Sequence, residues 1–368
     1  MHGGDIYRNK VHMDFSVNLN PAGTPAAVTD AIRSAHERAD RYPDPDQEQV
    51  RMIIADAVGV QSENIVAGNG ASELIMAAVR AADPKKALLF EPCFSGYRHA
   101  LQAARCEVKQ YVTEEGKGFS ITAEAVEAIE KDVDLVFVCD PLCPAGLHVE
   151  ESILKMLLRR AEQCGATVIL DESFYLLSER SAMTQIRIRQ ADQMNDDEGI
   201  GEGGTDRVAD LIRKYDNMIV IRSLTKVLAI PGIRCGYAIG NGKVIEKMKQ
   251  QLPEWNLSVV AEEAIKAGIR TICETDYLKR SVEMIRQERA YLTDALRSMK
   301  LTVFDSKAPY LLFTGPKDLY AKLLQQGILI RDCSDYEGLG KGYFRIGIKS
   351  RVENEMLAEA MRGILDAL

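Results

Sequence analysis

Three ionisable side chains stand close to the ends of short apolar runs, where their types could carry chemistry. Lys226 follows an S-L-T turn that comes shortly after the run Met218–Ile221, and a lysine amine can attack a carbonyl carbon. Asp171 ends the run Thr167–Leu170. Arg345 stands in the run Y-F-R-I-G, and a guanidinium can pair with a carboxylate through two hydrogen bonds. The same residues are also compatible with structural roles: the lysine could lie on the surface, the aspartate could cap a helix, and the arginine could form a structural ion pair.

A glycine-rich turn could add a phosphate site. The stretch Gly68-Asn69-Gly70-Ala71-Ser72 precedes a helical pattern at Leu74–Arg80. Unpaired backbone N–H groups at a helix N-terminus bind phosphate, helped by the helix dipole. A turn that only caps a helix has the same sequence, so this motif needs the support of others.

Apolar runs alternate with helical patterns through the middle of the chain, which predicts an α/β fold with a largely parallel sheet. Helical spacing predicts helices at Val50–Val58 and Glu150–Gln163. The apolar runs that we interpret as buried strands are Ala87–Phe90, Asp134–Cys139, Thr167–Leu170, Met218–Ile221 and Tyr237–Ile239.

The pattern changes after Pro253 and indicates a smaller α+β lobe. Its predicted elements are helices around Ala261–Cys273 and Tyr277–Met299, strands near Tyr310–Phe313 and Tyr343–Ile348, and a last helix from Asn354. We therefore expect three parts: residues 1–44, an N-terminal arm that belongs partly to the small domain; residues 45–255, the large domain; and residues 256–368, the small domain.

The composition excludes several classes of protein. The chain has 368 residues, 46 Lys plus Arg against 54 Asp plus Glu and a net charge of −8, so it lacks the basic surface that nucleic acid or anionic lipid requires. It has no apolar run of about 18 residues that could span a membrane and no secretory signal pattern, and we expect a cytoplasmic protein. The eight scattered cysteines predict neither a metal site nor a disulfide framework.

One dinucleotide-binding motif is rejected on its context. Gly199, Gly201 and Gly204 have the spacing G-x-G-x-x-G, but acidic residues precede them where the motif needs a strand. We expect a surface loop over Met194–Thr205.

The region around Lys226 resembles a known family. Ser223-Leu224-Thr225-Lys226 followed by P-G-I-R-C-G-Y is similar to the cofactor-lysine region of fold-type-I pyridoxal-phosphate enzymes, in the branch that holds histidinol-phosphate aminotransferase and threonine-phosphate decarboxylase. The resemblance spans nearly the whole chain. It implies a large domain that binds pyridoxal 5′-phosphate and a smaller α+β domain. Lys226 would form a Schiff base with the cofactor aldehyde, and Asp171 would keep the pyridinium nitrogen protonated so that the ring accepts an electron pair.

The resemblance also implies further ligands, residue by residue. For the cofactor these are the loop residues Gly70, Ala71 and Ser72, then Ser223 and Arg234 for the phosphate, Phe94 stacked on the ring, Cys143 near the 3′-oxygen, and Tyr42 reaching in from a partner subunit. For a small amino-acid substrate they are Arg345 for the carboxylate, Arg331 for a second anion, and His2 and Asn20 near a substrate phosphate. Because Tyr42 would act in trans, we expect a homodimer.

Some residues favour one branch and others depart from the family. The H-G-G start, the D-F-S-x-N-x-N-P run and Phe174 are similar to threonine-phosphate decarboxylase. Cys143, in D-P-L-C-P-A-G, stands where the family has an asparagine that donates to the 3′-oxygen, and the loop Glu179–Arg207 is longer than the usual connection.

Three functions remain open on the sequence. The resemblance favours decarboxylation of a phosphorylated amino acid such as L-threonine O-3-phosphate, in cobalamin biosynthesis. The first alternative is an aminotransferase that acts on histidinol phosphate or a similar substrate, with Lys226 moving the Cα proton. The second is a weakly active pyridoxal-phosphate-binding regulatory protein, which Cys143 and the long loop suggest. The intact Lys226 and Asp171 argue against this last function.

Overall fold

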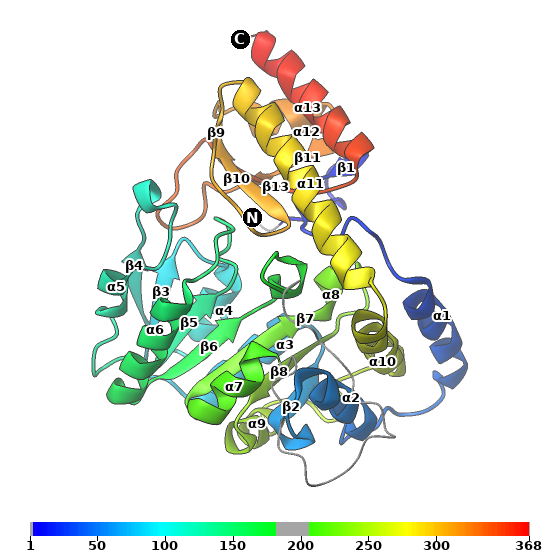
Figure 1. The fold of residues 1–368 in the computed structure, drawn as a ribbon, viewed down its shortest axis with the longest axis vertical. Coiled ribbons are helices and arrows are strands. Elements are labelled where there is room, and N and C mark those ends of the chain that lie inside the picture. The colour runs from blue at the N-terminus through cyan, green and yellow to red at the C-terminus, as the bar shows by residue number, and fades with distance from the viewer. Residues whose placement is uncertain (1–2, 182–205, 368) are drawn as a thin grey trace.

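A mostly parallel sheet forms the centre of the larger lobe, in the lower part of Figure 1. The computed structural model describes residues 3–181 and 206–367, and within them this sheet has seven strands. In order across the sheet they are β2 (Ile65–Gly68), β8 (Gly236–Gly240), β7 (Met218–Ser223), β6 (Thr167–Asp171), β5 (Leu135–Cys139), β3 (Lys86–Glu91) and β4 (Glu107–Val112).

The strand directions bring several strand ends to one edge of this sheet. From β7 to β4 each strand runs parallel to its neighbour, whereas β8 is antiparallel to both β2 and β7. Asp171 of β6 pairs with Cys139 of β5 on one side and with Ile221 of β7 on the other. Ligands bind at the carboxyl ends of adjacent parallel strands in open α/β sheets, so this edge is the expected place for a site.

Amphipathic helices cover the sheet because its central strands are apolar on both faces. In α6, for example, Leu154, Leu157 and Leu158 are buried, and Gly165 ends the helix with a φ of 75° that suits glycine. The helices of this lobe are α2 (Glu48–Val58), α3 (Ala71–Ala82), α4 (Ser95–Ala103), α5 (Ala123–Val126), α6 (Glu151–Cys164), α7 (Arg207–Lys214), α8 (Leu224–Val227) and α9 (Gly242–Lys249), with 3-10 turns η2 (Ser62–Asn64), η3 (Glu115–Lys117) and η4 (Tyr175–Leu177).

The smaller lobe, at the top of Figure 1, holds an antiparallel sheet packed against helices. Its strands, in order, are β12 (Arg331–Asp332), β13 (Tyr343–Gly347), β10 (Tyr310–Thr314) and β9 (Thr302–Val303). The helices of this half of the chain are α10 (Val259–Glu274), α11 (Tyr277–Ser298), α12 (Leu319–Gln325) and α13 (Arg351–Asp366). The long helix α11 contacts both α13 and η4, so it joins the two lobes.

The N-terminal arm contacts the second half of the chain. Strand β1 (Met13–Asp14) pairs in parallel with β11 (Ile328–Leu329), and helix α1 (Ala26–Ala35), which continues into η1 (His36–Arg38), packs against α10. Phe15, directly after β1, is fully buried. The division into three domains stays a prediction.

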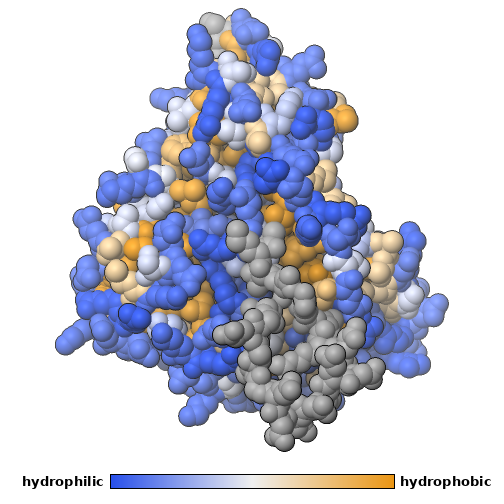
Figure 2. Space-filling model, viewed as in Figure 1, coloured by the Kyte–Doolittle hydropathy of each residue, from blue (hydrophilic) through white to orange (hydrophobic). Residues whose placement is uncertain are grey.

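The predicted α/β class with a mostly parallel sheet is confirmed, and each of the five strands predicted for the large domain overlaps an observed strand. Two strands of the large sheet were missed: β2, which is only four residues long, and β4, an edge strand whose residues are exposed or half-buried. Figure 2 shows a largely hydrophilic face, and none of the described helices is long and apolar enough to cross a membrane. The three glycines of the rejected dinucleotide motif lie outside the described residues.

Candidate active site

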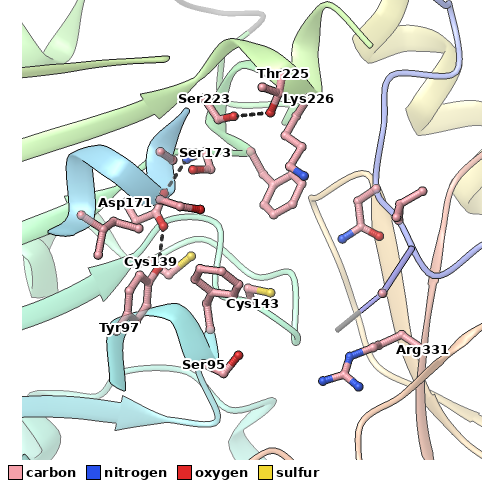
Figure 3. A pocket seen from close by; sticks show the side chains of 18 of the residues that line it. Ser95, Tyr97, Cys139, Cys143, Asp171, Ser173, Ser223, Thr225, Lys226 and Arg331 are labelled. Carbon is pink, nitrogen blue, oxygen red and sulfur yellow. Dashed lines mark hydrogen bonds between the residues drawn. The ribbon is translucent and has the colours of Figure 1, made fainter. Parts of the chain in front are cut away.

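A cavity of about 210 Å³ lies at the carboxyl edge of the large sheet, with walls from both lobes and from the N-terminal arm. Figure 3 shows Lys226 and Asp171 on the side of the large sheet and Arg331 across from them. The cavity collects residues that lie far apart in the chain, from Gly3 to Arg345. The predicted site residues that line it are Ala71, Ser72, Phe94, Cys143, Asp171, Ser223, Lys226, Arg234, Arg331 and Arg345.

Lys226 reaches the cavity because β7 ends at Ser223 and a single helical turn, α8, follows. Its amine lies 5.9 Å from the centre of the Phe174 ring. Burial, followed by the positive charges of Arg345 and Arg234, lowers the pKa of Lys226 to about 8. The amine is therefore partly neutral near physiological pH, which is the form that attacks a carbonyl.

Asp171 ends β6 and is held by two hydrogen bonds (Figure 3). The Tyr97 hydroxyl donates to its Oδ2 at 2.7 Å, and the backbone N–H of Ser173 donates to its Oδ1 at 2.9 Å. Burial raises the pKa of Asp171, while the two hydrogen bonds oppose this shift. A buried carboxylate in this setting gains from a cationic partner, and a protonated ring nitrogen would provide one.

The N-terminus of α3 and Arg234 form a cradle for an anion. Gly70 has a φ of 84°, which favours glycine, and a Cβ there would lie 2.5 Å from Nη2 of Arg234, so the loop passes directly beneath this guanidinium. Ala71 and Ser72 open the helix, where backbone N–H groups are unpaired. The Ser223 hydroxyl lies 2.6 Å from that of Thr225, at the wall of the same cavity. The cradle fits a phosphate group.

Two arginines stand opposite each other on the small-lobe wall. Arg331 of β12 is the register partner of Arg345 of β13, and both are buried. Arg331 donates to Asp335 at 2.7 Å. Arg345 donates to Sγ of Cys143 at 3.1 Å and to the Ser16 carbonyl at 3.3 Å, while its Nε has no partner. Arg331 thus has a carboxylate partner, whereas none of the ion pairs among the described residues involves Arg345, so an anion in the cavity would supply its countercharge.

Phe94 and Phe174 contribute aromatic surface to the cavity. The Phe94 ring covers Gly96, where a Cβ would lie 2.2 Å from the ring, and it meets Tyr97 edge to face with centroids 5.5 Å apart. Phe174 meets Tyr310 in the same way at 5.1 Å. Either ring could pack against a flat ligand.

The structure does not bring every predicted residue to this cavity. The side-chain nitrogen of Asn20 donates to the Val227 carbonyl and to the hydroxyls of Tyr277 and Ser281, all at 2.8 Å. Asn20 thus joins the arm to α8 and α11, and it does not line the cavity. Tyr42 is 81% exposed and also lies outside the cavity. His2 lies outside the described residues.

Several residues of the cavity were missed by the sequence analysis, including three that contribute polar or aromatic groups. Tyr97 binds Asp171, Tyr336 packs under Arg331 with 5.2 Å between the guanidinium and the ring centre, and Asn18 has a buried Oδ1 without a partner. Asn18 lies inside the D-F-S-x-N-x-N-P run, so this motif could have identified it as a site residue. Tyr97 and Tyr336 have no signal in the sequence pattern.

A buried ion network lies directly behind the strand ends. Arg222 donates to Glu172 at 2.8 Å and to Asp206, and Arg207 bridges Glu172 to Asp140. Asp140 is also bound to His148 at 2.6 Å. Glu172 and Asp140 directly follow Asp171 and Cys139 in the chain, so this network fixes the strand ends that carry the site.

Comparison with known proteins agrees with this geometry. The chain is 30% identical over 361 residues to the threonine-phosphate decarboxylase of Salmonella typhimurium, covering 97% of this chain and 92% of the relative. It is 26% identical to a histidinol-phosphate aminotransferase of Methanosphaera stadtmanae, covering 95% and 89%. The crystal structure of the histidinol-phosphate aminotransferase from Clostridium acetobutylicum superposes with a TM-score of 0.83 at 27% identity, covering 97% of this chain and all of the other.

The family model for aminotransferase class I and II matches residues 10–364. The relatives are named as a decarboxylase and an aminotransferase, and the resemblance expected from the sequence is confirmed. This chain is an enzyme that belongs to the aminotransferase class I and II family.

Proposed function

We propose that the chain binds pyridoxal 5′-phosphate in this cavity and decarboxylates a phosphorylated amino acid of the type of L-threonine O-3-phosphate. The facing pair of buried arginines, Arg331 and Arg345, carries the proposal, because a substrate with both a carboxylate and a phosphate supplies an anion for each. The relative from Salmonella typhimurium supports this substrate class.

The residues present fit the cofactor. The phosphate would lie in the cradle of Gly70, Ala71, Ser72 and Arg234, and Lys226 would hold the aldehyde. Asp171 would hold a proton on the ring nitrogen. When bound, this cofactor supplies an electron sink for the pair released as a bond to the substrate Cα breaks.

The protein's own groups then account for binding and proton transfer. Arg345 would bind the substrate carboxylate and Arg331 the phosphate, which fixes how the substrate lies in the cavity. In the overall reaction the bond from Cα to the carboxylate breaks, carbon dioxide leaves and a proton is added at Cα. Lys226, with a pKa of about 8, can deliver that proton near neutral pH.

Transamination of a phosphorylated amino acid uses the same contacts and is the alternative outcome. The purified protein, supplied with pyridoxal phosphate and L-threonine O-3-phosphate, should release carbon dioxide while the cofactor stays in its aldehyde form. Accumulation of pyridoxamine phosphate would instead indicate the aminotransferase. No turnover of any phosphorylated amino acid tried would favour a regulatory protein. Lys226→Arg is the control for a contaminating activity.

We further propose a homodimer in which Tyr42 completes the partner's site. Tyr42 and Trp255 form an exposed aromatic pair with ring centres 5.0 Å apart, and exposed aromatic surface is typical of interfaces. Sedimentation of the protein should give twice the chain mass of 40.8 kDa, and a monomer would contradict the proposal. A cytoplasmic location and a role in cobalamin biosynthesis remain predictions.

A further inference from the structure

The thiol of Cys143 and the guanidinium of Arg345 are in contact on the cavity wall. Sγ of Cys143 lies 3.1 Å from Nη1 of Arg345, and both residues line the cavity. The two side chains are nearly buried, with exposed fractions of 5% and 8%. They come from different lobes, since Cys143 follows β5 and Arg345 lies on β13, so the contact exists only in the assembled cavity.

One buried polar atom of this contact lacks a partner among the described residues, which points to a ligand. Nε of Arg345 makes no hydrogen bond. A buried N–H without an acceptor costs free energy, and a guanidinium pairs with a carboxylate through two parallel hydrogen bonds. A carboxylate in the cavity would therefore satisfy Arg345 right beside the sulfur.

The charges around the sulfur favour an anionic reactant. Of the described residues lining the cavity, Lys226, Arg234, Arg331 and Arg345 are cationic, and Asp171 is the single carboxylate. These four cations attract an anionic electrophile toward the sulfur.

We propose that Cys143 is a covalent modification site for small electrophiles that carry a carboxylate, with Arg345 as the group that binds the carboxylate. With iodoacetate, Sγ forms a bond to the methylene carbon, the carbon–iodine bond breaks, iodide leaves with the electron pair, and the thiol proton passes to solvent. The methylene is one bond from the carboxylate, so docking on Arg345 brings the carbon to the sulfur. This inference goes beyond the proposed function and holds with or without its reaction.

The product would occupy the cavity. The cavity of about 210 Å³ is several times the roughly 30 Å³ that one water molecule takes up in the liquid, so a two-carbon acid fits. Its carboxylate would lie on the guanidinium that we assign to the substrate. Carboxylate-bearing electrophiles should therefore block the site irreversibly.

Rates of alkylation at individual cysteines test the proposal. The full-length purified protein is treated with iodoacetate or with uncharged iodoacetamide, and the adducts are followed by mass spectrometry of peptides. Cys164, which is half-buried on α6 and does not line the cavity, serves as the internal reference. The ratio of the iodoacetate rate to the iodoacetamide rate should be higher at Cys143 than at Cys164 by about tenfold, as expected for a docked reactant.

Variants test whether the preference of Cys143 for iodoacetate depends on the guanidinium of Arg345. Arg345→Gln should bring the ratio at Cys143 down to that at Cys164, whereas Arg41→Gln, at an exposed arginine, should leave it unchanged. Should Arg345→Gln fail to fold, propionate must slow the labelling of Cys143 in the wild type more than propionamide does. Equal ratios at both cysteines, no adduct at Cys143, or a preference that survives in folded Arg345→Gln would each overturn the proposal. The readout is peptide mass, so failure of the decarboxylase function cannot be mistaken for this result.

Discussion

The hydroxyl of Tyr97 donates a hydrogen bond of 2.7 Å to Oδ2 of Asp171, which ties α4 to the end of β6. The Tyr97 ring stacks on Phe137 of the neighbouring strand with centroids 4.5 Å apart, so the donor is fixed in position. Burial raises the pKa of both Tyr97 and Asp171. Because a phenol is much the weaker acid, the proton stays on Tyr97 and the negative charge on Asp171.

Tyr97→Phe should destabilise the protein by removing this donor from a buried carboxylate. A hydrogen bond to a charged group contributes about 1.5–3 kcal/mol, and we expect a loss of that size in the free energy of unfolding at pH 7, measured with urea. Tyr7→Phe, at a residue that is 94% exposed, is the control and should change it by less than about 0.5 kcal/mol. An equally small effect at Tyr97 would mean that water replaces the lost hydroxyl.

Asp171→Asn should retain cofactor binding in part and lose most turnover, because the ring nitrogen would lose its charged partner. A charge-assisted hydrogen bond of roughly 1.5–3 kcal/mol corresponds to about a 10- to 150-fold loss in kcat as a minimum. Steady-state kinetics with saturating cofactor measures the loss. A variant of near-normal activity would make Asp171 a structural residue that only orients Ser173.

Lys226→Met should stabilise the cofactor-free protein at neutral pH. Because the pKa of Lys226 falls from 10.5 to about 8 in the folded state, the folded protein bears the full cost of burying this charge below pH 8. Between pH 8 and 10.5 the unfolded chain binds the proton that the folded chain has released, so the wild type gains stability as pH rises. The variant's advantage, on the order of 3 kcal/mol at pH 7, should shrink over that interval.

Urea unfolding of both proteins at pH 7, 8, 9 and 10 measures this advantage. Lys131→Met, at an exposed lysine, is the control, and its difference from the wild type should be small and flat with pH. A difference between Lys226→Met and the wild type that does not vary with pH would contradict the lowered pKa.

Arg222→Met should cost about 3–5 kcal/mol of stability, the range for removing one partner of a buried ion pair. Arg222 is fully buried between Asp206 and Glu172, and its loss leaves two carboxylates short of a cation. Arg213→Met removes an exposed pair with Asp210 on the same helix, α7, and should change stability by about 0–1 kcal/mol. Comparable losses in the two variants would show that the buried network contributes no more to the free energy of unfolding than an exposed ion pair does.

The sequence predicted those parts of the site that depend on local structure. Asp171 ends the apolar strand β6 and Lys226 lies one turn past the end of β7, and parallel strands bring their ends together whatever the other details of the fold. Tyr97 and Tyr336 enter through tertiary packing of elements far apart in the chain, which no local pattern records. Asn20 was assigned to the substrate by resemblance, yet its amide is used to hold the arm against two helices.

Cys143→Asn should shift the pH dependence of the bound cofactor's absorption spectrum to lower pH. We predict from the resemblance that residue 143 faces the 3′-oxygen of the ring, where a thiol is a weak donor and an asparagine amide a good one. The contact of Cys143 with Arg345 could survive in the variant, since an amide oxygen accepts from the guanidinium while the NH₂ group donates to the cofactor. The midpoint should fall by up to about one pH unit, the equivalent of a single hydrogen bond at roughly 0.5–1.5 kcal/mol.

Cys143→Ser, with a hydroxyl of similar size, is the control, and we expect a smaller shift in the same direction. Spectrophotometric titration of the three cofactor-loaded proteins measures the midpoint. An unchanged or raised midpoint in Cys143→Asn would show that residue 143 contacts Arg345 and donates no hydrogen bond to the cofactor oxygen.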